Sequence, residues 1–260
     1  MLTILTSPVS NFTDLGMMRI HISAVGFEID RIVLPAVKLK ADKVWLITHN
    51  NPSNDKGFEF VNKVKESLKK EKIEVDEEKA DRKDLFDTLR AFRTIVSREL
   101  GNQILVNVST GSKIQSIAFM MACMMFKDFG MIKPYYAEPD EYMTLSHEQE
   151  TSGLRDIKLL PDYKIEIPND NLIKCMVLIN KQKNGKVTKK KLRDLALEEK
   201  LIHVKEKKDN KEIAAYMALN KNIIEPLQNW NFIDIEKIGT SKIVTLSTDG
   251  RNALKFLNPQ

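Results

Sequence analysis

Short apolar runs alternate with amphipathic stretches over the first 140 residues of the chain. The runs are rich in β-branched residues and predict five strands, at 19–24, 43–48, 73–77, 103–108 and 133–137. Between them, apolar residues recur at helical spacing and predict helices after residue 27, over 55–71, over 81–100 and from residue 114. Strands that alternate with helices imply right-handed crossovers. The pattern therefore predicts an α/β fold with a doubly wound, mainly parallel sheet.

The pattern changes in the last third of the chain. Residues 138–168 hold several prolines among short apolar runs, which predict one or two added strands and then a linker. From Asn169 onward we expect helices over 170–182, over 189–201 and from Asp209 or Asn210 to about 230, then a hairpin over 232–246 and a last helix over 248–257. Three helices followed by a two-stranded wing are typical of a winged helix-turn-helix. The predicted domains are therefore 1–168 and 169–260.

A polar loop separates the fourth predicted strand from its helix. It contains three hydroxyl side chains, a glycine and a lysine, in the order Ser109, Thr110, Gly111, Ser112 and Lys113. A helix that starts just after a parallel strand offers unpaired N–H groups and a positive dipole end to an anion. Loops at the carboxyl ends of strands also line the usual ligand crevice of such sheets. The loop predicts a phosphate-bearing ligand, and the alternative is that Ser109 or Thr110 only caps the helix and Gly111 only makes the turn.

Composition excludes several classes of protein. The longest apolar run, residues 117–126, has half the length of a membrane-spanning helix, and no signal peptide is evident before it. Two cysteines in apolar helical contexts favour reduced thiols and a cytoplasmic location. Four scattered histidines do not make a metal site. We assign no function to residues 1–18.

Two common nucleotide-binding motifs are missing. Gly26 is the only glycine in the turn after the first strand, so the G-x-G-x-x-G fingerprint of dinucleotide-binding enzymes is absent. A G-x-x-x-x-G-K-[ST] phosphate loop is absent as well. We therefore predict no cofactor and no bound metal, and we assign no catalytic residue.

Positive charge is concentrated at the C-terminal end. Residues 169–260 contain 18 lysines and arginines against 11 acidic residues, whereas the remainder of the chain is slightly acidic. This asymmetry favours a module that faces nucleic acid, with a solvated lysine-rich surface as the alternative. Winged helices also serve as protein–protein modules, and that reading stays open.

Three motifs and the winged helix together resemble a known family. The motifs are ISAVGFEIDR at 22–31, NVSTGSK at 107–113 and YYAEP at 135–139. This combination resembles the CARF (CRISPR-associated Rossmann fold) proteins, and among them the archaeal CARF-like winged-helix transcriptional regulators. The resemblance covers nearly all of the chain past Met17. It implies a Rossmann-like sensor domain and a homodimer whose paired domains share a pocket for a cyclic oligoadenylate, usually cyclic tetra-adenylate.

The resemblance also implies which residues bind the ligand. The candidates are Ser23, Gly26, Phe27, Glu28, Asn107, Ser109, Thr110, Gly111, Ser112, Lys113 and Tyr136. Lys113 would meet phosphate as a point charge. Glu28 and Asp30, which we expect in the first turn of a helix beside the pocket, are an unfavourable pair for a polyphosphate.

The winged helix-turn-helix predicts binding to double-stranded DNA, with its third helix in the major groove and its wing against phosphate. The candidate contacts are Lys189, Lys190, Lys191, Lys211, Tyr216, Asn220, Lys221, Lys237 and Lys242. The predicted function is thus a ligand-gated transcriptional regulator.

Two other functions remain open from the sequence. The ribonuclease often attached to CARF domains needs an arginine four to six residues before a histidine, and none of the four histidines has one. A metal-independent ring nuclease is the remaining enzymatic reading, in which Lys113, Ser109 and Thr110 would stabilise charge while the ring cleaves itself. A regulator that senses another nucleotide or a phosphorylated metabolite is the third reading.

Overall fold

The N-terminal part of the molecule is built on a six-stranded sheet. A computed structural model describes residues 16–51, 57–143, 149–204 and 211–258. The strands are β1 (Arg19–Ala24), β2 (Lys43–His49), β3 (Glu74–Ala80), β4 (Gln103–Asn107), β5 (Met131–Glu138) and β8 (Asp156–Leu159). Their order is β3-β2-β1-β4-β5-β8, and only β8 runs antiparallel to its neighbour. The predicted Rossmann-like, mainly parallel sheet is confirmed.

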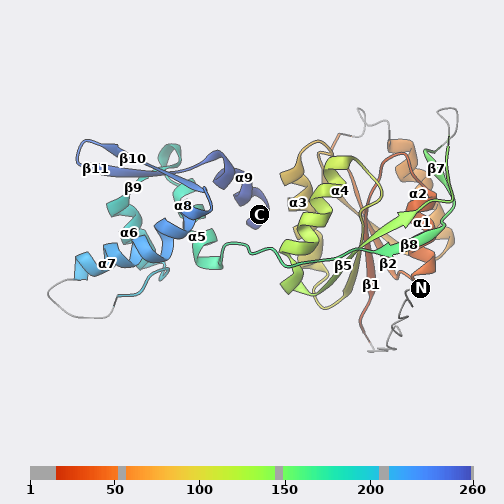
Figure 1. Cartoon of the computed structure of the whole chain (residues 1–260), viewed down its shortest axis with the longest axis horizontal. Coiled ribbons are helices and arrows are strands. Elements are labelled where there is room, and N and C mark those ends of the chain that lie inside the picture. The colour runs from red at the N-terminus through yellow and green to blue at the C-terminus, as the bar shows by residue number, and fades with distance from the viewer. Residues whose placement is uncertain (1–15, 52–56, 144–148, 205–210, 259–260) are drawn as a thin grey trace, which may run out of the picture.

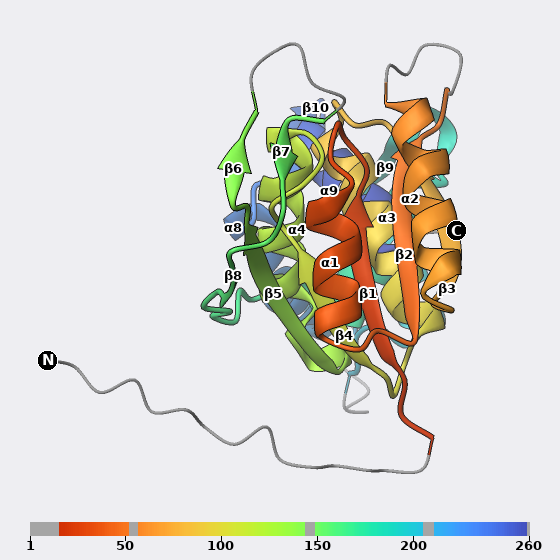
Figure 2. The same cartoon turned by 90° about the vertical axis from the view of Figure 1, so that its right-hand side faces the viewer.

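Helices cover both faces of this sheet (Figures 1 and 2). One face carries α1 (Asp30–Lys38) and α2 (Phe58–Lys70), and the other carries α3 (Leu85–Arg98) and α4 (Lys113–Met125). The inner strands β1, β2 and β4 are buried on both faces, which suits their high content of apolar residues. A short 3-10 turn, η2 (Lys127–Phe129), follows α4.

A small hairpin lies over the start of α1. It pairs β6 (Glu141–Tyr142) with β7 (Thr151–Ser152), and the backbone N–H of Glu150 donates to the carbonyl of Phe27 at 3.1 Å. The Gln149 side chain accepts hydrogen bonds from the backbone N–H groups of Ile29 and Asp30 at 3.0 and 3.3 Å. The hairpin thereby takes the capping role that α1 lacks in its own sequence.

The C-terminal part is a winged helix. Its elements are α5 (Asp170–Asn180), η3 (Lys183–Gly185), β9 (Lys186–Thr188), α6 (Lys189–Glu198), α7 (Lys211–Leu219), η4 (Asn220–Ile224), α8 (Glu225–Asn229), β10 (Ile233–Ile238), β11 (Ser241–Leu246) and α9 (Thr248–Leu257). The three strands pair in the order β10-β11-β9. Side-chain caps from Asn169, Thr188 and Ser247 start α5, α6 and α9 as predicted.

Helix α9 packs against the α/β part of the molecule (Figure 1). The ring of Phe256 stacks with Phe86 of α3 at a centroid distance of 6.3 Å and meets Phe126, the residue after α4, at 6.4 Å. The Lys255 ammonium lies 3.7 Å from the Asp84 carboxylate at the start of α3. The last helix of the winged helix is therefore also a contact to the α/β domain.

Several details differ from the sequence-based predictions. Strand β9 was missed because it is only three residues long, and the third helix contains a π-helical stretch, η4. Two apolar residues of that helix, Ile213 and Met217, are 60% and 67% exposed, although a helix of a globular domain is expected to bury its apolar residues. The predicted helix caps at Asp209 and Asn210 and the predicted helix start at Asp55 lie outside the described residues.

Two further observations concern membrane spans and metal ligands. None of the described helices combines the length and the apolar character needed to cross a lipid bilayer. Within the same residues, no three histidine, cysteine or acidic side chains gather as the ligands of a metal ion would.

Candidate functional site

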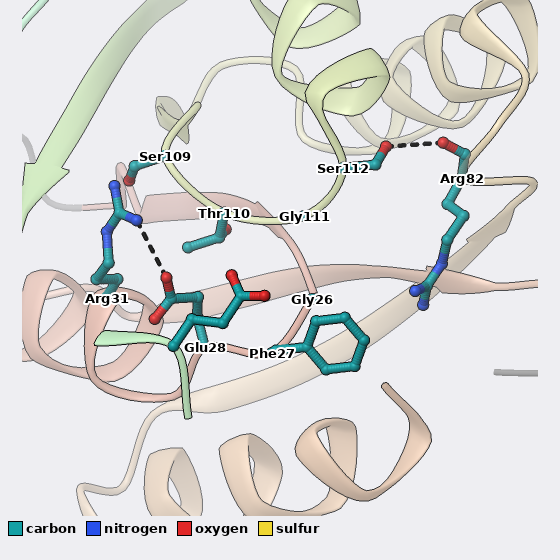
Figure 3. Close-up of a pocket in the computed structure, with 10 residues that line it drawn as sticks. Gly26, Phe27, Glu28, Arg31, Arg82, Ser109, Thr110, Gly111 and Ser112 are labelled. Atoms are coloured by element: carbon teal, nitrogen blue, oxygen red, sulfur yellow. Dashed lines mark hydrogen bonds and ion pairs between the residues drawn. The ribbon is translucent and has the colours of Figure 1, made fainter. Parts of the chain in front are cut away.

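A pocket opens between the loops that follow β1 and β4 (Figure 3). These two strands are neighbours, and the chain leaves them in opposite directions along the sheet, so the pocket lies at the topological switch point. Its volume is about 230 Å³. The lining residues are Gly26, Phe27, Glu28, Arg31, Arg82, Ser109, Thr110, Gly111, Ser112 and Glu150. Seven of the eleven residues predicted to bind ligand are among them.

Two of the predicted hydroxyl ligands have structural partners. Ser112 caps α4 by accepting from the backbone N–H of Gln115 at 3.2 Å, and the Gln115 side chain accepts from the Ser112 N–H at 2.9 Å. The Ser109 hydroxyl donates to the Asn107 side chain and accepts from the backbone N–H of Ala137 at 3.0 Å. Ser109 and Thr110 therefore do not cap the helix.

Thr110 differs from both serines. Its side chain is 1% exposed, and its hydroxyl has no hydrogen-bond partner among the described residues. A buried hydroxyl without a partner costs free energy of about 1–3 kcal/mol. Because Thr110 lines the pocket, a ligand placed there would supply the missing acceptor or donor.

Two acidic residues at the pocket, Glu28 and Asp30, are held by donors of the protein itself. Glu28 precedes α1 and is 4% exposed, its carboxylate lies 3.1 Å from the Arg31 guanidinium, and it also accepts from the Thr151 hydroxyl. Burial raises the pKa of Glu28, and the contacts to Thr151 and Arg31 oppose that rise. Asp30 accepts from the backbone N–H of Gly153 at 2.9 Å. The pair that we expected to repel phosphate is thus held by protein donors.

Three lining residues were missed by the sequence analysis. Arg31 and Arg82 approach the pocket from opposite sides (Figure 3). Glu150 also lines the pocket and lies just before β7 in the sequence. Arg31 also donates to the Ala137 carbonyl at 2.8 Å and lies 5.1 Å from the centre of the Tyr136 ring. Arg31 belongs to the first quoted motif, whereas nothing near Arg82 or Glu150 in the sequence marks them as pocket residues.

The other four predicted ligand residues lie beside the pocket without lining it. Ser23 and Asn107 are buried within β1 and β4, and the Asn107 amide donates to the Arg31 carbonyl at 2.7 Å. Lys113 is exposed in the first turn of α4. Tyr136 is half-buried on β5, and its hydroxyl is 3.4 Å from that of Tyr142.

The predicted DNA contacts lie on the winged helix, mostly exposed. Lys190, Lys191, Lys211, Lys221, Lys237 and Lys242 are exposed, and Lys189, Tyr216 and Asn220 are half-buried. The Tyr216 ring packs under the Arg193 guanidinium at 4.5 Å, which gives it a structural role.

Three of these lysines form a basic cluster beside the wing. Lys237 and Lys242 are directly paired across the two strands of the wing. Lys189 lies close enough to Lys242 for electrostatic repulsion between the two ammonium groups. Burial lowers the pKa of Lys189, and the charge of Lys242 lowers it further. None of the three forms an ion pair with a residue in the part of the chain that the structure describes.

The fold defines a class of protein: a Rossmann-like α/β domain with a switch-point pocket, joined to a winged helix. Two family models match the same two parts of the chain. The model described as "HFX_2341_N:-like, N-terminal" matches residues 19–142, and the "DUF6293 C-terminal winged helix domain" matches residues 171–258. The predicted fold class, a Rossmann-like α/β domain followed by a winged helix, is confirmed.

The chain is also similar to individual proteins. The uncharacterized protein MJ1513 of Methanocaldococcus jannaschii is 27% identical over 213 residues, which cover 72% of this chain and 64% of that relative's length. Among solved structures, Enterococcus italicus Csm6 bound to cyclic hexa-2'-fluoro-hexa-dAMP is 15% identical, with a TM-score of 0.41 over 49% of this chain and 34% of Csm6. Can2 from Sulfobacillus thermosulfidooxidans in complex with cyclic tetra-adenylate is 13% identical, with a TM-score of 0.40 over 92% of this chain and 63% of Can2. The chain thus spans less than two thirds of the length of each of these proteins.

Proposed function

We propose that this chain is a ligand-gated transcriptional regulator that binds double-stranded DNA through its winged helix and a cyclic oligoadenylate through its α/β domain. The observation that carries the ligand half is the pocket at the switch point between β1 and β4. Its walls offer the buried Thr110 hydroxyl and two arginines. These groups suit a phosphodiester, which accepts hydrogen bonds and carries negative charge.

The identity of the ligand follows from the motifs at 22–31 and 107–113, which line the pocket and resemble those of CARF proteins. A cavity of about 230 Å³ is smaller than the roughly 300–1,000 Å³ of most small-molecule sites. One chain therefore encloses only part of a ring of four nucleotides. A cyclic tetra-adenylate would need the equivalent pocket of a second copy.

A second copy would find an apolar surface on α4. Ile114 and Ile117 are 37% and 52% exposed on the helix that begins at the pocket loop. Helix α4 is apolar on nearly all sides, which is typical of a helix that is buried on more than one face. We propose that this face packs against its counterpart in a symmetric homodimer, which places the two pockets on opposite sides of the two-fold axis and on the same face of the dimer.

The DNA half of the proposal rests on the basic cluster. Lys237 and Lys242 are like charges paired directly across two strands, an arrangement that costs stability in the isolated protein. A DNA phosphate beside the wing would offset that cost. The exposed Ile213 and Met217 on the third helix offer apolar contact to thymine methyl groups in the major groove.

Ligand binding is tested by calorimetric titration of the full chain with cyclic tetra-adenylate and, separately, with AMP. We expect one ring per two chains and weaker or no binding of AMP. Saturation by AMP at one molecule per chain would favour the alternative function, a sensor of a single nucleotide. No heat from either compound would refute the ligand half of the proposal.

Incubation of the full chain with cyclic tetra-adenylate tests the ring-nuclease alternative. Cleavage would convert the ring to a linear product, which chromatography separates from the intact ring. Of the groups predicted to stabilise charge, the Ser109 hydroxyl already has two protein partners and Lys113 does not line the pocket. We therefore expect intact ring after several hours. Linear product that disappears in a Thr110→Val variant would instead assign catalysis to this pocket.

DNA binding is tested by fluorescence anisotropy with fragments from the region upstream of the chain's own gene. Affinity should fall as salt rises, because each phosphate contact releases counterions. A dimer should protect two half-sites whose centres are separated by whole turns of DNA. If no fragment binds at low salt, the winged helix is better explained as a protein–protein module.

A further inference from the structure

One segment of the chain touches both the pocket and the winged helix. Residues 81–84 connect β3 to α3. Within this segment, Arg82 lines the pocket, and its backbone carbonyl accepts a hydrogen bond from the Ser112 hydroxyl at 2.8 Å. Figure 3 shows this bond at the edge of the pocket. The segment is therefore attached to the loop that holds Thr110 and Gly111.

Two residues further on, the same segment meets the winged helix. One carboxylate oxygen of Asp84 caps α3 by accepting from the N–H groups of Phe86 and Asp87 at 2.8 and 3.2 Å. The other oxygen faces Lys255 of α9 at 3.7 Å. Phe86, in the first turn of α3, stacks on Phe256 of α9 at 6.3 Å. The start of α3 is thus a contact surface for the winged helix.

The segment is short and internally bonded. The N–H of Asp84 donates to the Asp81 carbonyl at 3.0 Å, and the N–H of Lys83 donates to the Asp81 carboxylate at 2.9 Å. The Asp81 N–H in turn donates to the Asp87 carboxylate at 2.7 Å. A turn with this many internal bonds moves as a unit, so a shift at Arg82 displaces the start of α3.

Helix α9 is equally well attached to the wing. Its cap residue Ser247 follows β11, and the Ser247 N–H donates to the Phe232 carbonyl at 3.0 Å. A β-carbon on Gly250 would lie 2.1 Å from that same carbonyl oxygen, so the helix sits directly against the chain that enters β10. Displacing α9 therefore displaces the wing.

We propose that residues 81–84 transmit the occupancy of the pocket to the winged helix, with Arg82 as the contact to the ligand and the Phe86–Phe256 pair as the contact to α9. This inference rests on the proposed function for its biological meaning. The mechanical coupling between the pocket loop and α9 is a property of the protein itself and needs no ligand to be measured.

Hydrogen–deuterium exchange on the full chain tests the coupling without a ligand. Phe86→Leu weakens the contact to α9 and leaves the pocket untouched, and Phe129→Leu is the matched control, because Phe129 is also a half-buried aromatic that packs on Phe126. We expect Phe86→Leu to raise exchange at least threefold in the 109–112 loop as well as in 84–90. The control should leave the 109–112 loop unchanged, and in both variants β2 should exchange as in the unmodified protein.

A change confined to 84–90 and α9 would overturn the proposal, because it would show that the Ser112–Arg82 bond does not transmit motion. Should Phe86→Leu fail to fold, Asp84→Asn gives the same decision: asparagine keeps the cap of α3 but removes the charge that faces Lys255. Lys164→Gln, at an exposed ion pair with Asp128, is its control.

A second experiment measures the binding of cyclic tetra-adenylate and of DNA. It distinguishes a failure of the proposed ligand from a failure of the proposed coupling. With cyclic tetra-adenylate as the probe, Arg82→Gln should weaken binding about tenfold, as expected for the loss of a charge-assisted hydrogen bond. Phe86→Leu should bind ring and DNA within twofold of the unmodified protein, while the effect of the ring on DNA affinity falls at least threefold. If the unmodified protein binds no ring, the proposed ligand is wrong and the exchange result still decides the coupling.

Discussion

Gly26 and Gly111 approach each other backbone to backbone at the base of the pocket. A β-carbon on Gly26 would lie 3.2 Å from both the Cα and the N atom of Gly111. Gly111 has a φ of +81°, and a β-carbon there would lie 2.5 Å from the β-carbon of Ala24. The loops after β1 and β4 therefore interlock, and the pocket exists in this shape only because both residues lack a side chain.

Gly111→Ala should destabilise the protein strongly. The positive φ costs an alanine about 1–2 kcal/mol, and the overlap with Ala24 adds about 1–3 kcal/mol. Gly101→Ala is the matched control, because Gly101 also has a positive φ, +87°, but a β-carbon there would meet nothing within 4 Å. Urea denaturation of both variants gives the difference. Equal losses of unfolding free energy would mean that the close approach of the two loops has no energetic weight.

The order of strands and helices could be predicted from the sequence, because the pattern of apolar residues differs between the two kinds of element. The inner strands β1, β2 and β4 are buried on both faces, so their apolar runs stand out from the amphipathic helices between them. The motif NVSTGSK contributes four lining residues, because a loop between a strand and a helix is continuous in sequence. The position of the pocket could be predicted from the same loop, because it follows the carboxyl end of a parallel strand.

The rest of the site depends on contacts between segments that are far apart in the sequence. Arg82 reaches the pocket only because the β3–α3 segment packs on the pocket loop, and Glu150 only because a hairpin folds back over Phe27. Local periodicity contains no information about such contacts. The true cap of α4 was visible, however: Ser112 and Gln115 match the S-x-x-Q capping box.

Thr110→Val should lower the affinity for cyclic tetra-adenylate without lowering the unfolding free energy of the protein. Valine has nearly the shape of threonine but lacks the hydroxyl, which is buried and has no partner in the described structure. Removing an unsatisfied polar group should raise the unfolding free energy by about 1 kcal/mol or leave it unchanged, while affinity for cyclic tetra-adenylate falls. Thr110→Ser, which keeps the hydroxyl, should retain binding. A clear loss of stability in Thr110→Val would show that the hydroxyl has a partner within the protein.

Acid should destabilise the α/β domain through His21. This residue is fully buried in β1, where burial lowers its pKa from 6.5 to about 4. Because the folded-state pKa is the lower one, the unfolded chain takes up the proton first. Stability that is complete above pH 6.5 is therefore lost as the pH falls toward 4, by at most about 3 kcal/mol.

The pH dependence can be assigned with one variant. His21→Gln cannot titrate, so its unfolding free energy should vary less between pH 6.5 and 4 than that of the unmodified protein. His203→Gln, at an exposed position in the winged helix, is the control and should keep the original profile. If His21→Gln and the unmodified protein lose stability in parallel, another group is responsible for the acid sensitivity.

The basic cluster should matter for DNA and not for folding. Lys237 and Lys242 repel each other across the wing, so Lys242→Ala should leave the unfolding free energy unchanged or raise it by a few tenths of a kcal/mol. If both lysines contact phosphate, each alanine variant should weaken binding to every DNA sequence alike. Each should also reduce the slope of log affinity against log salt by about 0.9. Lys38→Ala, in the last turn of α1, removes the same charge from the α/β domain and should leave that slope unchanged. Equal slopes of log affinity against log salt for Lys242→Ala and Lys38→Ala would show that the wing does not contact DNA phosphate. The winged helix would then be better explained as a protein–protein module.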